Sequence, residues 1–296
     1  MKSYFFLFFY STFLYITLNG QVINSNAIDY GKSMQRKISF NLEEIKVRWK
    51  KAALENCTGV PCVVTPPAPS FTCGTSTVSD YEGNAYNTVL IGTQCWTESN
   101  LKVTKYNDGT LIPDLTASTS NPWAPTSGAR TGYDVSVVTL SDYVGTFGYL
   151  YNWYAVNDSR KLCPNGWHVP TDSDFNKLVK SIHSGADTSS TNTSLILSIS
   201  AGTVLKSDVT NSSVGSGLGW DPGTNGTNTS GFSALPGGYR QPIGIFSDIR
   251  VFAFFWLATE VNPSLARVRS VNNANGFVIR DSSPKTVGCS VRCLKD

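Results

Sequence analysis

The cysteines of this 296-residue chain constrain its fold more than any other feature. There are seven, and all lie after residue 56: Cys57, Cys62, Cys73, Cys95, Cys163, Cys289 and Cys293. Metal binding is the main competitor to disulfide bonding, but the chain has only two histidines and no C-x-x-C pair, so no metal site is expected. In an exported chain the cysteines are expected to form disulfides. Because seven is odd, at least one thiol stays unpaired or pairs with another chain.

The N-terminus is typical of a secretory signal peptide. Lys2 supplies a positive charge, residues 4–18 are mostly apolar, and Asn19-Gly20 offers a cleavage site. We therefore predict a signal peptide over residues 1–20. The alternative is an uncleaved anchor, although the apolar run is shorter than the roughly 20 residues that a membrane span needs.

The mature chain is expected to be secreted or held at the outer cell surface. No cysteine follows the apolar run directly, which argues against a lipoprotein. No transmembrane segment is expected after signal removal, because the apolar stretch at 251–258 is far too short and is typical of a buried strand.

Residues 21–56 are predicted to form an N-terminal extension with one amphipathic helix at 38–55. Asn41 and Glu44 have the spacing of a capping box. The apolar residues at helical spacing are Leu42, Ile45, Trp49 and Ala52. Such a stripe needs a partner, and the sequence leaves three open: the main domain, a second copy of the chain through self-association, or another protein.

Residues 57–70 are predicted to be a linker rich in cysteine and proline. Cys57 and Cys62 flank a turn with Gly59 and Pro61, so they are expected to close a local disulfide loop. The main domain follows at 71–296.

Charge is unevenly distributed along the chain. Residues 27–56 carry a net charge of +3, whereas residues 70–296 carry −1. A domain this close to neutral lacks the basic surface that nucleic acid requires, so no nucleic-acid partner is expected.

The main domain has the sequence pattern of an α+β fold. A helix is predicted after Pro170, with Thr171 as its N-cap and Phe175 and Leu178 on its apolar side. Residues 184–231 are polar and glycine-rich, which is typical of long loops. A closing run of strands is predicted at 245–260, 265–271, 276–281 and 288–294.

Several ordered segments of the main domain together resemble one family. They include Ile91-Gly-Thr-Gln-Cys-Trp96, Tyr106-Asn-Asp-Gly109, Gly148-Tyr-Leu-Tyr-Asn-Trp-Tyr-Ala155, Leu162-Cys-Pro-Asn-Gly-Trp-His-Val-Pro-Thr171, Gly231-Phe-Ser-Ala-Leu-Pro-Gly-Gly-Tyr-Arg240 and Ser290-Val-Arg-Cys293. The chain resembles the Fibrobacter succinogenes major paralogous domain over about 71–296. That family occurs on exported bacterial proteins, mostly of the Bacteroidetes and Fibrobacteres, and it has no established activity.

The resemblance implies a fold similar to C-type lectin-like and formylglycine-generating-enzyme domains. Such a domain has a small, twisted antiparallel sheet, about two flanking helices and long loops, here preceded by the N-terminal helix. Three sites depart from the family pattern: Phe175, the run at 255–260, and Cys289. The departure at Cys289 implies that it is the odd thiol. The implied pairs are then Cys73–Cys95 and Cys163–Cys293.

No catalytic constellation or cofactor site is recognised. Glu98 and Glu260 each follow a tryptophan and are the candidates for a polysaccharide hydrolase. The competing interpretation is that each carboxylate caps backbone amides. His168 and His183 have no nucleophile motif beside them, and the cysteines of formylglycine-generating chemistry have no counterpart here.

The C-terminal region at 239–287 is the candidate ligand-binding surface. Arginine and aromatic residues are common at binding hot spots, and the resemblance implies variable binding residues in this region. The candidates are Tyr239, Arg240, Phe246, Asp248, Arg250, Phe254, Arg267, Arg269, Asn272, Asn275, Arg280 and Asp281. The expected function is an exported binding or adhesion module for a glycan or a protein. The alternatives are the hydrolase and a structural component of the cell envelope.

Overall fold

The structure is a computed structural model, and it describes residues 6–10, 13–18, 21–25, 70–116, 126–133, 140–189, 196–209 and 218–296. The chain divides into two units, Met1–Pro69 and Ser70–Asp296. The predicted helix at 38–55 and the predicted Cys57–Cys62 loop lie outside the described residues. None of the helices in the described ranges is long and apolar enough to span a membrane.

The described part of the first unit is a three-stranded antiparallel sheet with the order β1-β2-β3. Its strands are β1 (Phe6–Tyr10), β2 (Phe13–Leu18) and β3 (Gln21–Ser25). The first two strands fall within the predicted signal peptide, so they belong to the uncleaved chain. Removal of residues 1–20 remains a prediction.

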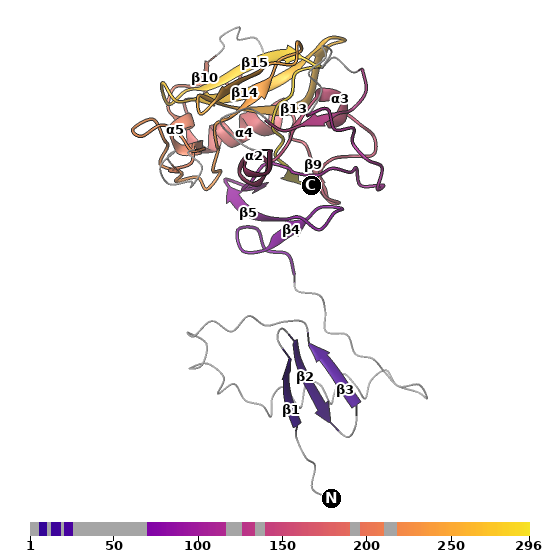
Figure 1. Ribbon diagram of the computed structural model, residues 1–296. Coiled ribbons are helices and arrows are strands. Elements are labelled where there is room, and N and C mark those ends of the chain that lie inside the picture. The colour runs from indigo at the N-terminus through magenta and orange to yellow at the C-terminus, as the bar shows by residue number, and fades with distance from the viewer. Residues whose placement is uncertain are drawn as a thin grey trace, which may run out of the picture. The chain divides into compact units, whose positions relative to one another are not determined.

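The second unit is built around a six-stranded sheet with the order β10-β15-β14-β13-β11-β12. All neighbours are antiparallel except β11 and β13, which run parallel. Figure 1 shows β13, β14, β15 and β10 as one layer, with α4 and α5 on one side of it. The strands are β10 (Ile196–Ser198), β11 (Gly237–Arg240), β12 (Phe246–Ile249), β13 (Phe252–Asn262), β14 (Leu265–Asn272) and β15 (Val278–Pro284).

A second sheet joins the two ends of this unit. Its order is β4-β5-β6-β16-β9, so the C-terminal strand lies between strands from the beginning and the middle of the domain. Its strands are β4 (Thr77–Ser79), β5 (Ala85–Ile91), β6 (Gln94–Thr97), β9 (Trp167–His168) and β16 (Leu294–Lys295). A short pair, β7 (Arg130–Thr131) and β8 (Leu150–Tyr151), completes the described strands.

The helices of the described residues are short. They are α2 (Leu140–Phe147), α3 (Trp153–Val156), α4 (Asp172–Ile182) and α5 (Ala201–Leu205). The α+β class and the helix after Pro170 are confirmed. The expectation of one small sheet with about two helices was too simple, because α2, α3 and α5 are too short for a helical period to be visible in the sequence. The region at 184–231, expected to be loop, contains β10 and α5.

Both faces of β13 contribute to the core. Phe255 and Leu257 belong to the apolar cluster that includes Phe175 of α4 and Leu205 of α5. Trp256, on the opposite face, belongs to the cluster around Trp153 of α3, and its indole Nε1 donates to the Tyr151 carbonyl at 2.8 Å. A strand that is buried on both faces explains the continuous apolar run at 251–258.

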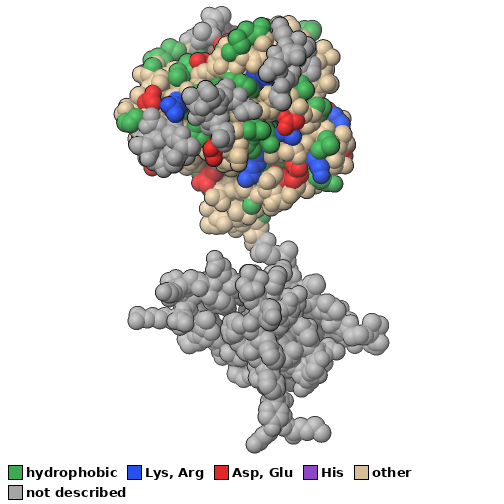
Figure 2. Space-filling view, in the orientation of Figure 1, with side chains coloured by type: hydrophobic (Ala, Val, Ile, Leu, Met, Phe, Trp, Pro, Cys, Tyr) green, Lys and Arg blue, Asp and Glu red, His purple; other side chains and the backbone are tan. Residues whose placement is uncertain are grey.

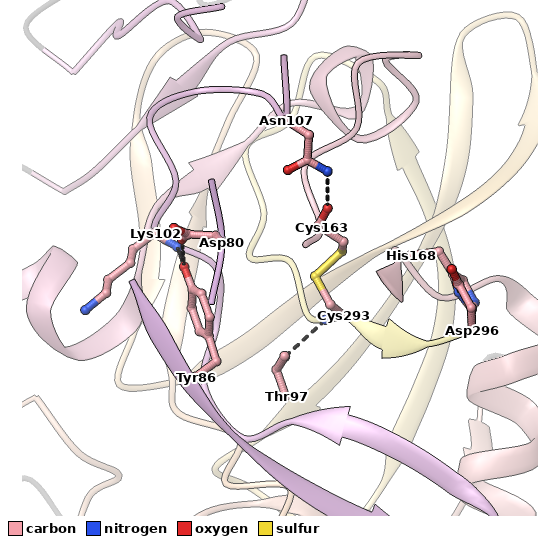
Figure 3. The surroundings of a disulfide bond; sticks show 9 residues. All are labelled: Asp80, Tyr86, Thr97, Lys102, Asn107, Cys163, His168, Cys293 and Asp296. Atoms are coloured by element: carbon pink, nitrogen blue, oxygen red, sulfur yellow. Dashed lines mark hydrogen bonds and ion pairs between the residues drawn. A yellow bond between two sulfur atoms is a disulfide. The ribbon is translucent and has the colours of Figure 1, made fainter. Parts of the chain in front are cut away.

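Two disulfides tie the second unit together. Cys163–Cys293 joins residues 130 positions apart, and Cys73–Cys95 joins residues 22 positions apart. These are the two pairs that the family resemblance implied. Around the first pair, Asn107 Nδ2 donates to the Cys163 carbonyl at 2.6 Å and the Cys293 amide donates to Thr97 Oγ1 at 3.1 Å (Figure 3). Disulfides of this kind indicate an extracytoplasmic protein.

Cys289 is the free thiol among the cysteines that the structure describes, and it is buried. Burial in apolar surroundings raises the pKa of this thiol well above its usual range. A thiol held in its neutral form is a poor nucleophile. Cys289 therefore serves as a small core residue rather than as a reactive group.

The N-terminus of α4 carries a complete capping box. Thr171 Oγ1 accepts from the Asp174 amide at 3.2 Å, and Asp174 Oδ2 accepts from the Thr171 amide at 3.0 Å. His168 lies nearby: its Nε2 is 3.5 Å from Asp174 Oδ2, and its ring faces Asp296 (Figure 3). Burial raises the pKa of Asp174, but hydrogen bonds from Thr171 and the charge of His168 outweigh it, so the net pKa lies below the usual range.

This lowered pKa predicts an acid-dependent contribution to stability. A carboxylate with a lowered folded-state pKa stabilises the fold above its unfolded value of 3.8, and the contribution is lost as pH falls through the folded value. Asp174→Asn is expected to lower the free energy of unfolding by about 1 kcal/mol at neutral pH. Urea unfolding at pH 7 and near pH 2 would test this, since the two proteins should converge at low pH. An equal difference at both values would contradict it.

Candidate binding surface

Part of the predicted binding set is buried and cannot contact a ligand. Arg240, Arg269, Asn272 and Arg280 lie inside the domain. The prediction of these four as surface residues was wrong. Internal oxygens accept from the three guanidinium groups, and Asn272 Oδ1 accepts from the backbone amides of Ala274 and Asn275. The acceptors of the three guanidinium groups are the Leu115 carbonyl and Thr131 Oγ1 for Arg240, Asp172 and Asn176 for Arg269, and the Asp187 and Ser189 carbonyls for Arg280.

Other members of the set come together on the six-stranded sheet. The Tyr239 ring of β11 meets the Phe254 ring of β13 edge to face, with 5.0 Å between centroids. Phe254 in turn stacks on Phe252 at 5.2 Å. All three side chains are half-buried. Phe252 was missed by the sequence analysis, although its place two residues before Phe254 in a strand puts both on one face.

The strand register extends this aromatic group into a row across the sheet. Phe254 lies opposite Ser270 of β14, Ser270 opposite Ile279 of β15, and Ile279 opposite Ile196 of β10. We call Tyr239, Phe252, Phe254, Ile279 and Ile196 the outer-face row. Its neighbours in sequence, such as Phe255, point to the other face, which α4 and α5 cover. Ile196 is 37% exposed, and the rest of the row is half-buried.

The segment at 248–250, which covers the end of β12 and the start of the turn before β13, lies beside the row and holds two unusual backbone conformations. Asp248 has a φ of 63° and Arg250 a φ of 68°, in the left-handed region that non-glycine residues rarely adopt. The Val251 amide donates to the Asp248 carbonyl at 3.0 Å, and the Arg250 amide donates to the Pro236 carbonyl at 2.8 Å. Conformations of this kind cost about 1–3 kcal/mol each and cluster at functional sites.

The pKa values of Asp248 and of the neighbouring Tyr239 are both shifted. Burial raises the pKa of its carboxyl above the usual range. Burial raises the pKa of Tyr239 as well, and the charge of Asp248 adds to that effect. The Tyr133 hydroxyl donates to the carbonyl of Ser247 in β12, next to Asp248. The charge of Asp248 therefore acts on Tyr239 of β11, a member of the outer-face row.

The remaining predicted residues have separate positions. Phe246 packs on Tyr133, with 4.4 Å between ring centroids. Asn275 Oδ1 accepts from the Phe277 amide at 2.9 Å and so holds a turn. Asp281 is exposed and lies two residues beyond Ile279, on the face of the row, whereas Arg267 lies on the opposite face, the face of Arg269.

The comparison with family models agrees with the ordered segments seen in the sequence. The model of the Fibrobacter succinogenes major domain matches residues 89–295. The chain belongs to this family. No curated protein and no solved structure matches it significantly. The second structural unit begins before the match, at Ser70, because β4 pairs with β5 and Cys73 bonds to Cys95.

In this Fibrobacter succinogenes major domain, the two candidate acids of a hydrolase lie in different surroundings. Glu260 forms an ion pair with Lys285 at 3.0 Å. Glu98 lines a separate cavity with Arg292. A general acid and a general base must flank one bond, and Glu260 is not among the residues that line the cavity of Glu98.

The histidines of the domain are engaged in structural contacts. His168 Nδ1 lies 2.6 Å from Asp296 Oδ1, and His183 Nδ1 lies 2.8 Å from Ser198 Oγ. Among the residues that the structure describes, no group of three or more His, Cys, Asp or Glu side chains is arranged to hold a metal ion.

Proposed function

We propose that this protein is an exported binding module that contacts a polypeptide partner through the outer-face row and the adjoining segment at 248–250. The observation that carries the proposal is the row itself, in which aromatic side chains of β11 and β13 and aliphatic side chains of β15 and β10 share one face of the sheet, with the buried Ser270 of β14 between them. We also propose that the domain has a C-type lectin-like fold and acts in the secreted state or at the outer cell surface.

The composition of the row favours a polypeptide over a glycan. Tyrosine, phenylalanine and arginine are typical of protein–protein hot spots, and the row adds Ile279 and Ile196, whose aliphatic side chains offer no flat ring for a sugar to stack on. Arg250 and Asp248 lie at its edge and would supply the polar rim. On the face shown in Figure 2, acidic and basic side chains of the described residues are interspersed.

Paired alanine variants test the proposal. The secreted protein would be screened for binding to a panel of purified extracellular proteins and a panel of glycans. For a protein ligand so found, Tyr239→Ala and Arg250→Ala are expected to weaken binding at least about tenfold, which is 1.4 kcal/mol.

The matched control is Tyr81→Ala, because Tyr81 is 54% exposed and lies in the turn between β4 and β5, away from the six-stranded sheet. It should bind like the unchanged protein. Wild-type binding by both Tyr239→Ala and Arg250→Ala would reject the surface. Binding to glycans alone would reject the polypeptide partner.

A further inference from the structure

A second candidate site is a polar cavity near the start of the second sheet. Its volume is about 220 Å³, below the range of about 300–1,000 Å³ that is common for drug-sized ligands. It is lined by residues from β5, the segment after β6, α2, the loop before β11 and the C-terminal segment. Those used below are Asn87, Glu98, Ser99, Thr146, Leu235 and Arg292.

Arg292 forms the inner wall of the cavity and is held rigidly. It is 2% exposed, and its Nε donates to Asn100 Oδ1 at 2.6 Å. Nη1 donates to the carbonyls of Thr97 at 2.9 Å and Phe232 at 2.6 Å, and Nη2 donates to the Ser233 carbonyl at 3.0 Å. A guanidinium has five N–H groups. One N–H of Nη2 is therefore left without a partner among these bonds, on a side chain that lines the cavity.

Glu98 provides a negatively charged hydrogen-bond acceptor in the same cavity. Its backbone amide donates to the Asn87 carbonyl at 2.9 Å, which fixes the position of the residue. Its half-buried carboxylate forms no hydrogen bond or ion pair with any described side chain, although its charge favours the charged form of Arg292. The cavity thus contains a hydrogen-bond acceptor and a donor that do not satisfy each other.

This combination limits the chemistry of a ligand. Glu98 and Arg292 together contribute no net charge, so a neutral ligand fits best. A hydroxyl group can donate to a carboxylate and accept from a guanidinium at once. Ser99, Thr146 and Asn87 add further hydroxyl and amide groups, and Leu235 supplies an apolar contact for C–H groups. We propose that this cavity binds one neutral polyhydroxylated ring, such as a single monosaccharide unit, between Glu98 and Arg292.

Titration with simple sugars tests the proposal. The probes are the methyl glycosides of neutral hexoses, with glycine and alanine as zwitterions of similar size, and the readout is the chemical shift of the backbone amides. At least one glycoside is expected to saturate at about millimolar concentration and to shift the amide signals of Asn87, Ser99 and Thr146. Glu98→Gln should weaken that binding at least tenfold, and Thr146→Val, on the rim, should weaken it less.

The matched control is Glu260→Gln, which changes an acid outside the cavity and should leave glycoside affinity unchanged. If Glu98→Gln fails to fold, Thr146→Val alone must weaken binding. No saturation by any glycoside, binding of the amino acids instead, or unchanged affinity in the cavity variants would each overturn the proposal.

Discussion

Replacing Cys163 and Cys293 together by alanine is expected to lower the free energy of unfolding by about 5 kcal/mol. The bond links positions 130 residues apart, so its loss releases a long loop in the unfolded chain. It also joins the segment before β9 to the segment before β16, the strand that holds both ends of the domain in one sheet. Urea unfolding under oxidising conditions would measure the change.

The second disulfide gives the matched comparison. Cys73–Cys95 joins residues only 22 positions apart, so the Cys73→Ala, Cys95→Ala double variant is expected to lower the free energy of unfolding by about 3.5 kcal/mol. Cys289→Ala controls for the packing lost with a buried sulfur atom and should cost about 1 kcal/mol. Equal losses from the two double variants, or a smaller loss for the longer loop, would contradict the entropic argument.

The sequence predicts those features of the fold that depend on local chemistry. The helix at α4 was recognisable because Thr171 and Asp174 form a capping box directly before an apolar period. Pairing of the cysteines followed from the resemblance to the family, not from spacing, since spacing alone does not determine connectivity. The short helices were not visible, because α3 covers barely one turn.

The buried arginines show why the candidate surface could be predicted only in part. Arginine is mostly exposed in proteins, so Arg240 and Arg280 were reasonable surface candidates. Their burial depends on acceptors that arrive from distant segments: Leu115 for Arg240, and Asp187 and Ser189 for Arg280. Strand periodicity contains no information about such partners. Phe252 was missed for a related reason, because β13 is apolar on both faces and has no alternation to mark the outer one.

Arg292 is the clearest example of this kind of buried cation. Its guanidinium lies over the Phe232 ring, with 4.7 Å to the centroid, and its hydrogen bonds reach Thr97, Asn100, Phe232 and Ser233. All of these acceptors are neutral, and burial lowers the pKa of the guanidinium. The residue thus joins β6, the loop at 231–233 and the C-terminal segment through a single side chain.

Arg292→Met is therefore expected to lower the free energy of unfolding by about 3–5 kcal/mol. Methionine keeps much of the volume but leaves buried oxygens without donors. The free energy of unfolding of Arg292→Lys should lie between those of the unchanged protein and Arg292→Met. A single ammonium group cannot reach all the acceptors that surround the planar guanidinium. Arg267→Met is the matched control: Arg267 is half-buried on β14, and its loss should change stability by about 0.5 kcal/mol or less. Similar urea midpoints for Arg292→Met and Arg267→Met would show that the four acceptors find other donors, and that this buried cation is not what joins the segments.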